Sequence, residues 1–180
     1  MDNLICKILD EDIGEKSKEL VNPRVRWGAR GIVIRDDGKI AIFNKANKNE
    51  YKLPGGGIDE GESPEEGFIR EVLEETGCEI EIMQKLGIAE EYKTLDNFMQ
   101  ISHVFLGKVI KDTGNLHMTQ KEIDEGGRLL WLDVNEALEK IIDAYDKLIP
   151  SKYEMIYYMK FINLRDRKIL EYYIENKQNR

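Results

Sequence analysis

Several kinds of protein are excluded by what this 180-residue chain lacks. Its two cysteines are too few for a disulfide framework, which favours a reduced, cytoplasmic setting. No run of apolar residues is long enough for a membrane span, and residues 1–7 lack a secretory pattern. Basic residues are in deficit, because 27 Lys and Arg stand against 35 Asp and Glu, for a formal net charge of -8. We therefore expect neither a membrane partner nor a general nucleic-acid-binding surface.

Histidine and tryptophan are also scarce, with two residues of each. His103 falls in a predicted strand and His117 in a predicted loop, and neither has another His or Cys at ligand spacing, so a zinc site is not expected. Trp27 also falls in a predicted strand, where its large apolar area favours a place in the core over stacking on a bound base.

The order of the predicted strands and helices fits an α/β fold with a mixed β-sheet. Hydrophobic residues make up 41% of the chain, enough for a sizeable core. Strands are predicted over residues 24–35, 39–44, 51–53, 79–91, 99–110 and 128–133. Helices are predicted over residues 64–76 and 135–148, with a further helical segment from residue 151. Within that segment Asn163 is a candidate cap of a final helix, and residues 114–127 are expected to form a polar loop.

The two ends of the chain are expected to add to the main domain. We divide the sequence into an N-terminal arm over residues 1–22, a main domain over residues 23–150 and a helical extension over residues 151–180 that packs on it. The arm is either a strand or hairpin added to the main sheet or a partner-facing segment. The arm and the tyrosine-rich extension are the candidate surfaces for a homodimer.

The most informative segment covers residues 56–78. Ser63 is a favourable N-cap, Pro64 fits the first helical position and Glu66 completes a capping box. Gly77 suits a left-handed C-terminal cap. These signals predict a helix that begins at Pro64 and ends before Gly77.

Three acids of this helix share one face. Glu71, Glu74 and Glu75 are spaced i, i+3 and i+4, so their charges repel one another. A bound divalent cation would relieve this repulsion, and carboxylate oxygens suit Mg²⁺ or Mn²⁺. The competing interpretation is a solvated acidic face in a chain rich in glutamate.

A glycine-rich loop stands directly before the helix. Gly55, Gly56 and Gly57 follow a predicted strand, and glycine permits close approach of the backbone to a ligand. A strand, a glycine-rich loop and a helix start together predict a pyrophosphate site.

The same segment resembles the signature of the Nudix (MutT-like) hydrolase family, G-x5-E-x7-R-E-U-x-E-E-x-G-U, where U is a bulky aliphatic residue. The matching positions are Gly56, Glu62, Arg70, Glu71, Val72, Glu74, Glu75, Gly77 and Cys78. The last of these departs from the pattern, but a free cysteine packs as a small hydrophobic residue.

This resemblance implies an α/β/α sandwich with extra C-terminal helices, and hydrolysis of a pyrophosphate bond in a nucleoside diphosphate linked to another moiety. It implies Mg²⁺ or Mn²⁺ as cofactor, held by Glu71, Glu74 and Glu75, of which the last two are also the expected catalytic pair. Substrate binding is expected from the three glycines of the loop and from Arg70, which with Glu62 also ties the loop to the helix.

A further carboxylate outside the signature often serves as base or extra ligand in MutT-like proteins. Glu125 stands nearest the expected place and is the predicted catalytic residue. Glu122 and Asp124 in the same segment, and Glu90 and Glu91 at the end of a predicted strand, are alternatives. The competing interpretation of each is a solvated loop acid.

The sequence leaves the small-molecule substrate open. ADP-ribose, a nucleoside triphosphate, a nucleotide sugar and a dinucleoside polyphosphate all fit the signature. A regulator that kept the fold and binds nucleotides without turnover is the alternative function, although the filled acidic positions favour an enzyme. An isomerase of the same fold is disfavoured, because neither Cys6 nor Cys78 stands just before the helix.

Overall fold

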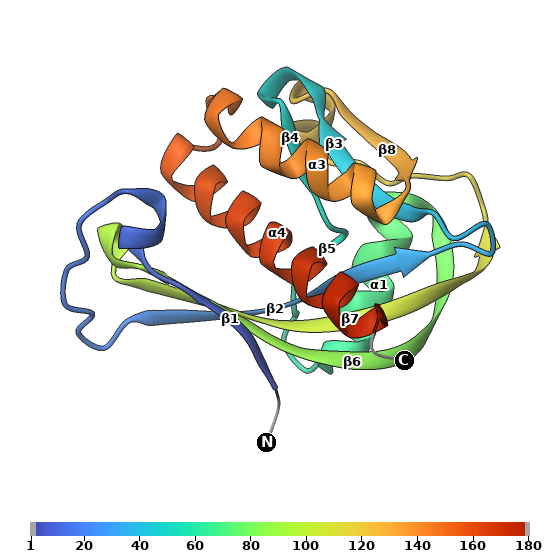
Figure 1. The fold of residues 1–180 in the computed structure, drawn as a ribbon, viewed down its shortest axis with the longest axis horizontal. Coiled ribbons are helices and arrows are strands. Elements are labelled where there is room, and N and C mark those ends of the chain that lie inside the picture. The colour runs from blue at the N-terminus through green and yellow to red at the C-terminus, as the bar shows by residue number, and fades with distance from the viewer. Residues whose placement is uncertain (1–2, 179–180) are drawn as a thin grey trace.

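The computed structural model describes residues 3–178, which form a mixed eight-stranded sheet with helices on both faces (Figure 1). The strands are β1 (Leu4–Ile8), β2 (Arg24–Ile34), β3 (Ile40–Lys45), β4 (Glu50–Lys52), β5 (Gly55–Gly57), β6 (Cys78–Lys93), β7 (Phe98–Asp112) and β8 (Gly127–Leu132). Neighbouring strands follow the order β1-β6-β7-β2-β3-β4, with β5 paired to β2 and β8 paired to β3. The pairs β1–β6 and β2–β7 are parallel and the others are antiparallel, so the predicted mixed sheet is confirmed.

The helices are α1 (Pro64–Thr76), α2 (Gln120–Asp124), α3 (Val134–Ala144) and α4 (Ile156–Gln178). α1 covers one face of the sheet, and α3 and α4 lie side by side on the other (Figure 1). Successive side chains of β2 point to opposite faces of the sheet. Ala29 and Val33 join the buried cluster of Phe68 on α1, whereas Ile32 joins the buried cluster of Ile169 on α4. This alternation builds the predicted α/β/α sandwich.

The ends of α1 are set by its capping residues. Ser63 Oγ accepts a hydrogen bond from the Glu66 backbone N–H at 3.2 Å, and the Glu66 carboxylate accepts one from the Ser63 N–H at 2.8 Å. Gly77 adopts a φ of 69°, and its N–H donates to the Leu73 carbonyl at 2.9 Å. Both predicted caps are confirmed, so local sequence alone fixes where the acidic face of α1 begins and ends.

The segment predicted as a polar loop over residues 114–127 contains the short helix α2. Thr119 and Glu122 form a second capping box, in which Thr119 Oγ1 accepts from the Glu122 N–H at 3.3 Å. Prediction of an uninterrupted loop is wrong here, because the Thr-x-x-Glu signal starts a helix in a stretch without an apolar stripe.

The C-terminal part forms one helix, α4, where the sequence predicts two. Asn163 does not cap a helix but lies buried within α4, where its Nδ2 donates to the Ile141 carbonyl of α3 at 2.8 Å. The polar residue that suggests a helix end is therefore explained by a contact between helices.

The N-terminal segment adds a strand to the main sheet, which is one of the two arrangements expected for it. β1 pairs in parallel with β6. Asp10, just beyond β1, is buried, and its carboxylate accepts hydrogen bonds from Thr94 and from the hydroxyl of Tyr157 on α4. The segment after β1 is thereby tied to the first turn of α4.

Trp27 is exposed, contrary to the prediction that it lies in the core. Its side chain is 49% exposed and stacks on His103 of β7, with 5.7 Å between ring centroids. The first four residues of β2 are all exposed, because this end of the strand extends beyond the buried clusters.

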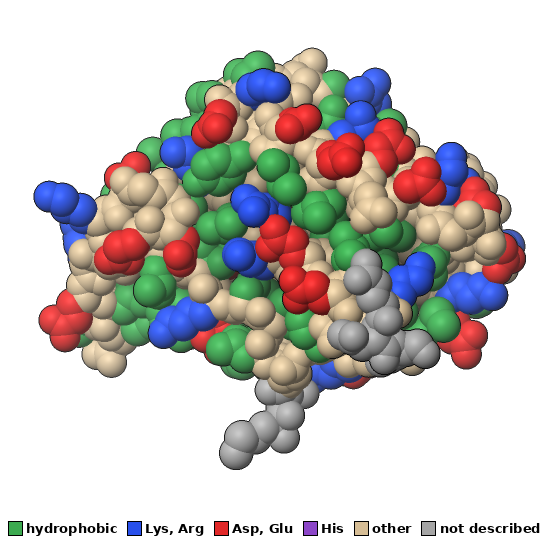
Figure 2. Space-filling model, viewed as in Figure 1, with side chains coloured by type: hydrophobic (Ala, Val, Ile, Leu, Met, Phe, Trp, Pro, Cys, Tyr) green, Lys and Arg blue, Asp and Glu red, His purple; other side chains and the backbone are tan. Residues whose placement is uncertain are grey.

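On the face that carries α3 and α4, acidic and basic side chains are interspersed with apolar ones (Figure 2). Among the helices described over residues 3–178, none combines the length and the apolar character that crossing a membrane requires.

Candidate active site

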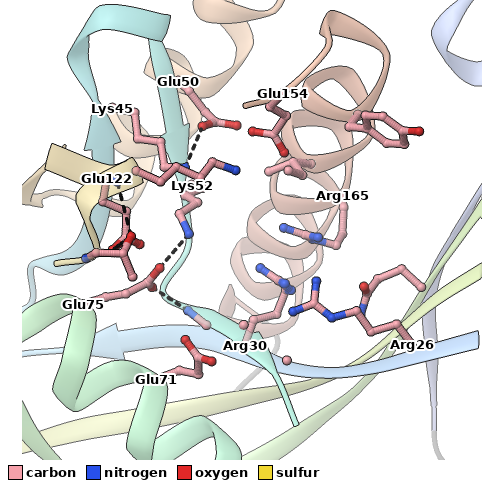
Figure 3. A pocket seen from close by; sticks show the side chains of 18 of the residues that line it. Arg26, Arg30, Lys45, Glu50, Lys52, Glu71, Glu75, Glu122, Glu154 and Arg165 are labelled. Carbon is pink, nitrogen blue, oxygen red and sulfur yellow. Dashed lines mark hydrogen bonds and ion pairs between the residues drawn. The ribbon is translucent and has the colours of Figure 1, made fainter. Parts of the chain in front are cut away.

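A cavity of about 370 Å³ opens between α1 and α4, with β2, β4 and β5 between them (Figure 3). Its walls carry charges of both signs. The cationic side chains are Arg26, Arg30, Lys45, Lys52, Lys93, Lys121 and Arg165. The carboxylates are Glu50, Glu71, Glu75, Glu122 and Glu154. A cavity walled by so many cations suits a ligand with several negative charges.

The glycine-rich loop forms β5 and borders this cavity. Gly55 has a φ of 136°, and a Cβ there would lie 2.3 Å from the Ala29 carbonyl oxygen. A Cβ on Gly56 would lie 2.5 Å from the carboxylate of Glu71. Glycine at both positions lets the loop pass between β2 and α1 and lets the Glu71 carboxylate touch the backbone.

Glu75 joins α1 to this loop. Its side chain is buried, and its carboxylate accepts hydrogen bonds from the Gly55 N–H at 2.8 Å and from Lys52 Nζ at 2.6 Å. Burial of Lys52 disfavours its charged form, but the nearby Glu75 carboxylate outweighs burial and raises the pKa of the lysine. A carboxylate oxygen keeps a second lone pair when it accepts one hydrogen bond, so Glu75 retains capacity for a further ligand.

Glu71 lies half-buried beside Glu75 at the cavity wall. Burial raises the pKa of the Glu71 carboxyl, the Arg70 hydrogen bond opposes this shift, and the charge of Glu75 adds to it. Two carboxylates set together in a partly desolvated place are unfavourable without a counter-charge.

Glu74 differs from the other two predicted metal ligands. Its side chain is 47% exposed, and its carboxylate lies 3.7 Å from Arg70 Nη1. Among the described residues, Glu71 and Glu75 line the cavity and Glu74 does not. The ligand role predicted for Glu74 therefore requires its side chain to turn toward the loop.

The guanidinium N–H groups of Arg70 donate hydrogen bonds to other residues of the protein. Its Nε and Nη2 donate to the Glu62 carboxylate at 2.8 and 2.9 Å, and Nη2 also donates to the Gly57 carbonyl at 2.9 Å. Nη1 donates to Glu71 at 3.0 Å. The hydrogen bonds to Glu62 are the main reason that the pKa of Arg70 is raised. This geometry positions the loop and Glu71, and the substrate contact predicted for Arg70 stays a prediction.

Glu125, the predicted catalytic residue outside the signature, lies in a buried ion cluster. Its carboxylate is 2.8 Å from Lys45 Nζ and 3.5 Å from Lys48 Nζ, and it accepts from Ser151 Oγ at 2.6 Å. Burial acts to raise the pKa of this carboxyl, but the bonds to Lys45 and Ser151 outweigh it and lower the pKa. Glu122, one turn earlier, lines the cavity. A catalytic role for Glu125 stays a prediction.

The alternatives at the end of β6 have other partners. Glu91 is fully buried and lies 3.0 Å from Arg165 Nη1 and 2.9 Å from Lys93 Nζ. Burial disfavours its charge, but these two cations outweigh burial and hold the pKa of the Glu91 carboxyl at about 2. Glu90 accepts a hydrogen bond from the Tyr92 hydroxyl at 2.9 Å. Neither carboxylate lines the cavity in the part of the chain that the structure describes.

Sequence reasoning missed the basic side of the cavity. Arg30 stands in an apolar stretch of β2, and Arg165 stands beside Asp166 in α4, and all three are buried. Charged residues inside apolar segments are a usable signal, since such residues are seldom fully buried unless paired. That signal does not show which residues a buried arginine contacts, however, because Arg30 and Arg165 come together only when α4 packs on the sheet.

Comparison with known proteins agrees with this geometry. The family model for the NUDIX domain matches residues 25–152, well over half of the chain. The chain is 31% identical over 115 residues to a MutT-like protein of Streptomyces ambofaciens, covering 64% of this chain and 68% of that one. It is 32% identical over 122 residues to an ADP-ribose pyrophosphatase of Methanocaldococcus jannaschii, covering 66% of this chain and 68% of that one.

A solved structure shows the same fold. The crystal structure of a MutT protein from Methanosarcina mazei matches with a TM-score of 0.53 at 21% identity, covering 87% of this chain and 99% of that one. The chain spans about half or less of the length of several other curated relatives that it matches. The extent of the family-model match, together with a signature whose Glu71 and Glu75 meet the glycine loop at one cavity, shows that the chain belongs to the Nudix (MutT-like) family.

Proposed function

We propose that the chain hydrolyses a pyrophosphate bond in a small nucleotide, with a divalent cation, Mg²⁺ or Mn²⁺, held by Glu71, Glu74 and Glu75. The observation that carries the proposal is the meeting of Glu71 and Glu75 with the glycine loop at a cavity lined by cationic side chains. The relatives support it, since one of them is named an ADP-ribose pyrophosphatase.

The donor set suits this cation even though no cluster of three or more His, Cys, Asp or Glu side chains in the described residues is already arranged to hold a metal. Carboxylate oxygens are the ligands that Mg²⁺ and Mn²⁺ prefer. Burial and the charge of Glu75 raise the pKa of Glu71, and a cation bound between the two carboxylates would stabilise the charged form of Glu71. When bound, the cation would polarise the phosphoryl oxygens and lower the pKa of an attacking water.

The residues of the chain itself bind and orient the phosphates. The glycine loop offers close backbone approach, and Lys52 brings a positive charge to the cavity beside Glu75. Arg70 holds Glu71 against Gly56. A base outside the signature would accept the proton of the attacking water. Glu125 is our predicted residue for this role, and Glu122 is the alternative that already faces the cavity.

The test is metal-dependent product release across a substrate panel, with wild-type protein and Glu75→Gln side by side. The panel holds ADP-ribose, nucleoside triphosphates, nucleotide sugars and dinucleoside polyphosphates. We expect the variant to lose at least about a hundredfold in kcat/KM on any substrate that the wild type cleaves with Mg²⁺ or Mn²⁺. Glu79→Gln is the matched control, because the Glu79 side chain is 44% exposed, lies outside the cavity and pairs with Lys111 at 2.7 Å.

Two outcomes would contradict the proposal. Equal turnover of Glu75→Gln and wild type would show that this acid of the signature takes no part in the reaction. Nucleotide binding without cleavage of any member of the panel would favour the alternative function, a regulator that binds nucleotides without turnover. The cytoplasmic setting and a homodimer stay predictions, and sedimentation with and without residues 1–22 tests the homodimer.

A further inference from the structure

We propose that three arginines opposite α1 form a subsite for an additional phosphate group, so that the substrate carries three or more consecutive phosphates. We call Arg26, Arg30 and Arg165 the arginine wall. This inference rests on the proposed function, because it places the substrate of that reaction in the same cavity. It selects nucleoside triphosphates and related polyphosphates over a diphosphate joined to a neutral sugar.

The guanidinium groups of the arginine wall face one another across from Glu71 and Glu75 (Figure 3). They come from two elements, since Arg26 and Arg30 lie on β2 and Arg165 lies on α4. The cavity therefore has an acidic end at α1 and a cationic end where α4 crosses β2.

Arg165 is fixed in place by buried acids. Its Nη1 is 3.0 Å from Glu91 and its Nε is 2.8 Å from Asp166. Asp166 in turn accepts a hydrogen bond from the Leu53 N–H at 2.9 Å, at the end of β4. The position of this guanidinium is set before a ligand arrives, so binding costs little side-chain ordering.

Arg30 is buried without comparable support. Its Nε donates to Ser102 Oγ at 3.2 Å, and its terminal nitrogens have no hydrogen-bond partner among the described residues. The pKa of Arg30 is lowered to about 10, mainly by burial and also by the charge of Arg165, while the carboxylates of Asp166, Glu91 and Glu75 partly offset this shift. A buried cation with unused donors beside a second cation is unfavourable, and an anion between them would satisfy both.

Arg26 extends the wall toward the glycine loop. A Cβ on Gly57 would lie 2.6 Å from Arg26 Nη2, so the guanidinium touches the loop at the residue after Gly56, whose neighbour is the Glu71 carboxylate. Arg26 is exposed and, over residues 3–178, makes no hydrogen bond or ion pair. A phosphate chain cleaved beside Glu71 would thus meet Arg26 and Arg30 directly past the loop.

A neutral sugar in this place would offer the arginine donors only uncharged hydroxyl and ring oxygens. Hydrogen bonds between a cation and a charged acceptor are stronger than those to a neutral one, so the subsite would hold a sugar less well. A phosphate supplies several charged acceptor oxygens and matches the planar donors of arginine. The charge of the subsite therefore favours a third phosphate over a ribosyl or hexosyl group.

The experiment compares kcat/KM for ATP and ADP-ribose, which share a base. Wild type is measured beside Arg26→Gln, Arg30→Gln and Arg30→Lys, with Arg167→Gln as the matched control. Arg167 lies on α4 near Arg165 but is 40% exposed and pairs with Glu171, outside the cavity. We expect wild type to favour ATP, and the ratio of the two values to fall about tenfold in Arg26→Gln and Arg30→Gln, a change of about 1.4 kcal/mol. Arg30→Lys should fall less, and Arg167→Gln should keep the wild-type ratio.

A binding measurement separates this inference from the proposed function. Inorganic tripolyphosphate and pyrophosphate are titrated into the same proteins by calorimetry, and we expect wild type to bind tripolyphosphate more tightly and Arg26→Gln to lose this preference. Loss of the preference in a protein that cleaves nothing would support the subsite and refute the hydrolase. A wild type that cleaves ADP-ribose better than ATP, or variants with an unchanged ratio, would refute the subsite and leave the hydrolase standing. Arg26 is exposed, so its variant tests the idea even if Arg30→Gln fails to fold.

Discussion

Two opposite sides of the cavity are built in different ways: the acidic wall, made of Glu71 and Glu75, and the arginine wall, which we also call the basic wall. The acidic wall comes from one helix and the loop before it, with Glu71 held by its neighbour Arg70 and Glu75 held by Gly55 of the loop. The basic wall comes from β2 and α4, and Arg165 reaches its place only because Glu91 and Asp166 hold it there. The comparison teaches that the end to which we assign the reaction is encoded within one segment of the chain, whereas the end that we assign to substrate choice depends on the assembled fold.

Removal of Arg165 gives the largest expected effect on the basic wall. Arg165→Gln leaves the buried carboxylates of Glu91 and Asp166 without their main partner, so we expect a loss of about 3–5 kcal/mol in the free energy of unfolding. Urea denaturation at neutral pH measures it. Arg167→Gln, which breaks a pair that is partly open to solvent, should cost about 0–1 kcal/mol. Equal losses in the two variants would show that the buried network does not support α4.

The pH dependence of stability should report the same network. The pKa of Glu91 is held at about 2 in the folded protein, below its ordinary value of 4.5. The unfolded chain therefore binds a proton before the folded one does, and the contribution of Glu91, a few kcal/mol, is present above about pH 5 and is lost as the pH falls toward 2.

Urea unfolding at a series of pH values checks this. The slope of the free energy of unfolding against pH between about 5 and 2 should be shallower in Glu91→Gln than in wild type. Glu79→Gln, which changes a half-buried acid paired with Lys111, should retain the wild-type slope. A Glu91→Gln protein with an unaltered slope would mean that other groups carry the acid sensitivity.

The acidic wall can be disturbed without changing any charge. In Gly56→Ala the new Cβ would lie 2.5 Å from the Glu71 carboxylate, which must move away from the loop. We expect kcat/KM to fall by about a hundredfold, because misplacement of about 1 Å at a reacting site has effects of this size. The melting temperature should change far less than the activity does. Unchanged kcat/KM would show that the contact between Glu71 and Gly56 does not matter for turnover.

The smallest expected effect concerns the helix that carries the acidic wall. Ser63→Ala removes the hydroxyl that caps α1 and should lower the free energy of unfolding by about 1 kcal/mol. Ser17→Ala is the control, since the Ser17 hydroxyl bonds to Glu11 outside any α-helix of the described chain. No difference between the two variants would indicate that Glu66 and Pro64 suffice to start the helix.

The sequence predicts one wall of the site well because its signals are local. Ser63 and Gly77 mark both ends of α1, and each is read from residues within one turn. The same reasoning misses α2, whose capping box starts a helix without an apolar stripe, and divides α4 at Asn163, whose partner is a carbonyl on another helix.

The basic wall lies beyond such reasoning for a physical reason. Arg30 and Arg165 are far apart in the chain, and nothing in either local segment indicates the other. Trp27 shows the same limit, since its exposure depends on how far β2 extends past the buried clusters and not on its own strand pattern. The predicted role of Glu125 also depends on packing, because its carboxylate lies among Lys45, Lys48 and Ser151.

The position of α4 has a consequence for the order in which the cavity is assembled during synthesis. A ribosome completes the signature helix and its loop well before it reaches residues 156–178. A nascent chain at that stage holds the acidic wall but lacks Arg165, and the buried acid Glu91 lacks its arginine partner. The cavity is therefore complete only when α4 has packed on the sheet, because Arg165 forms part of its lining.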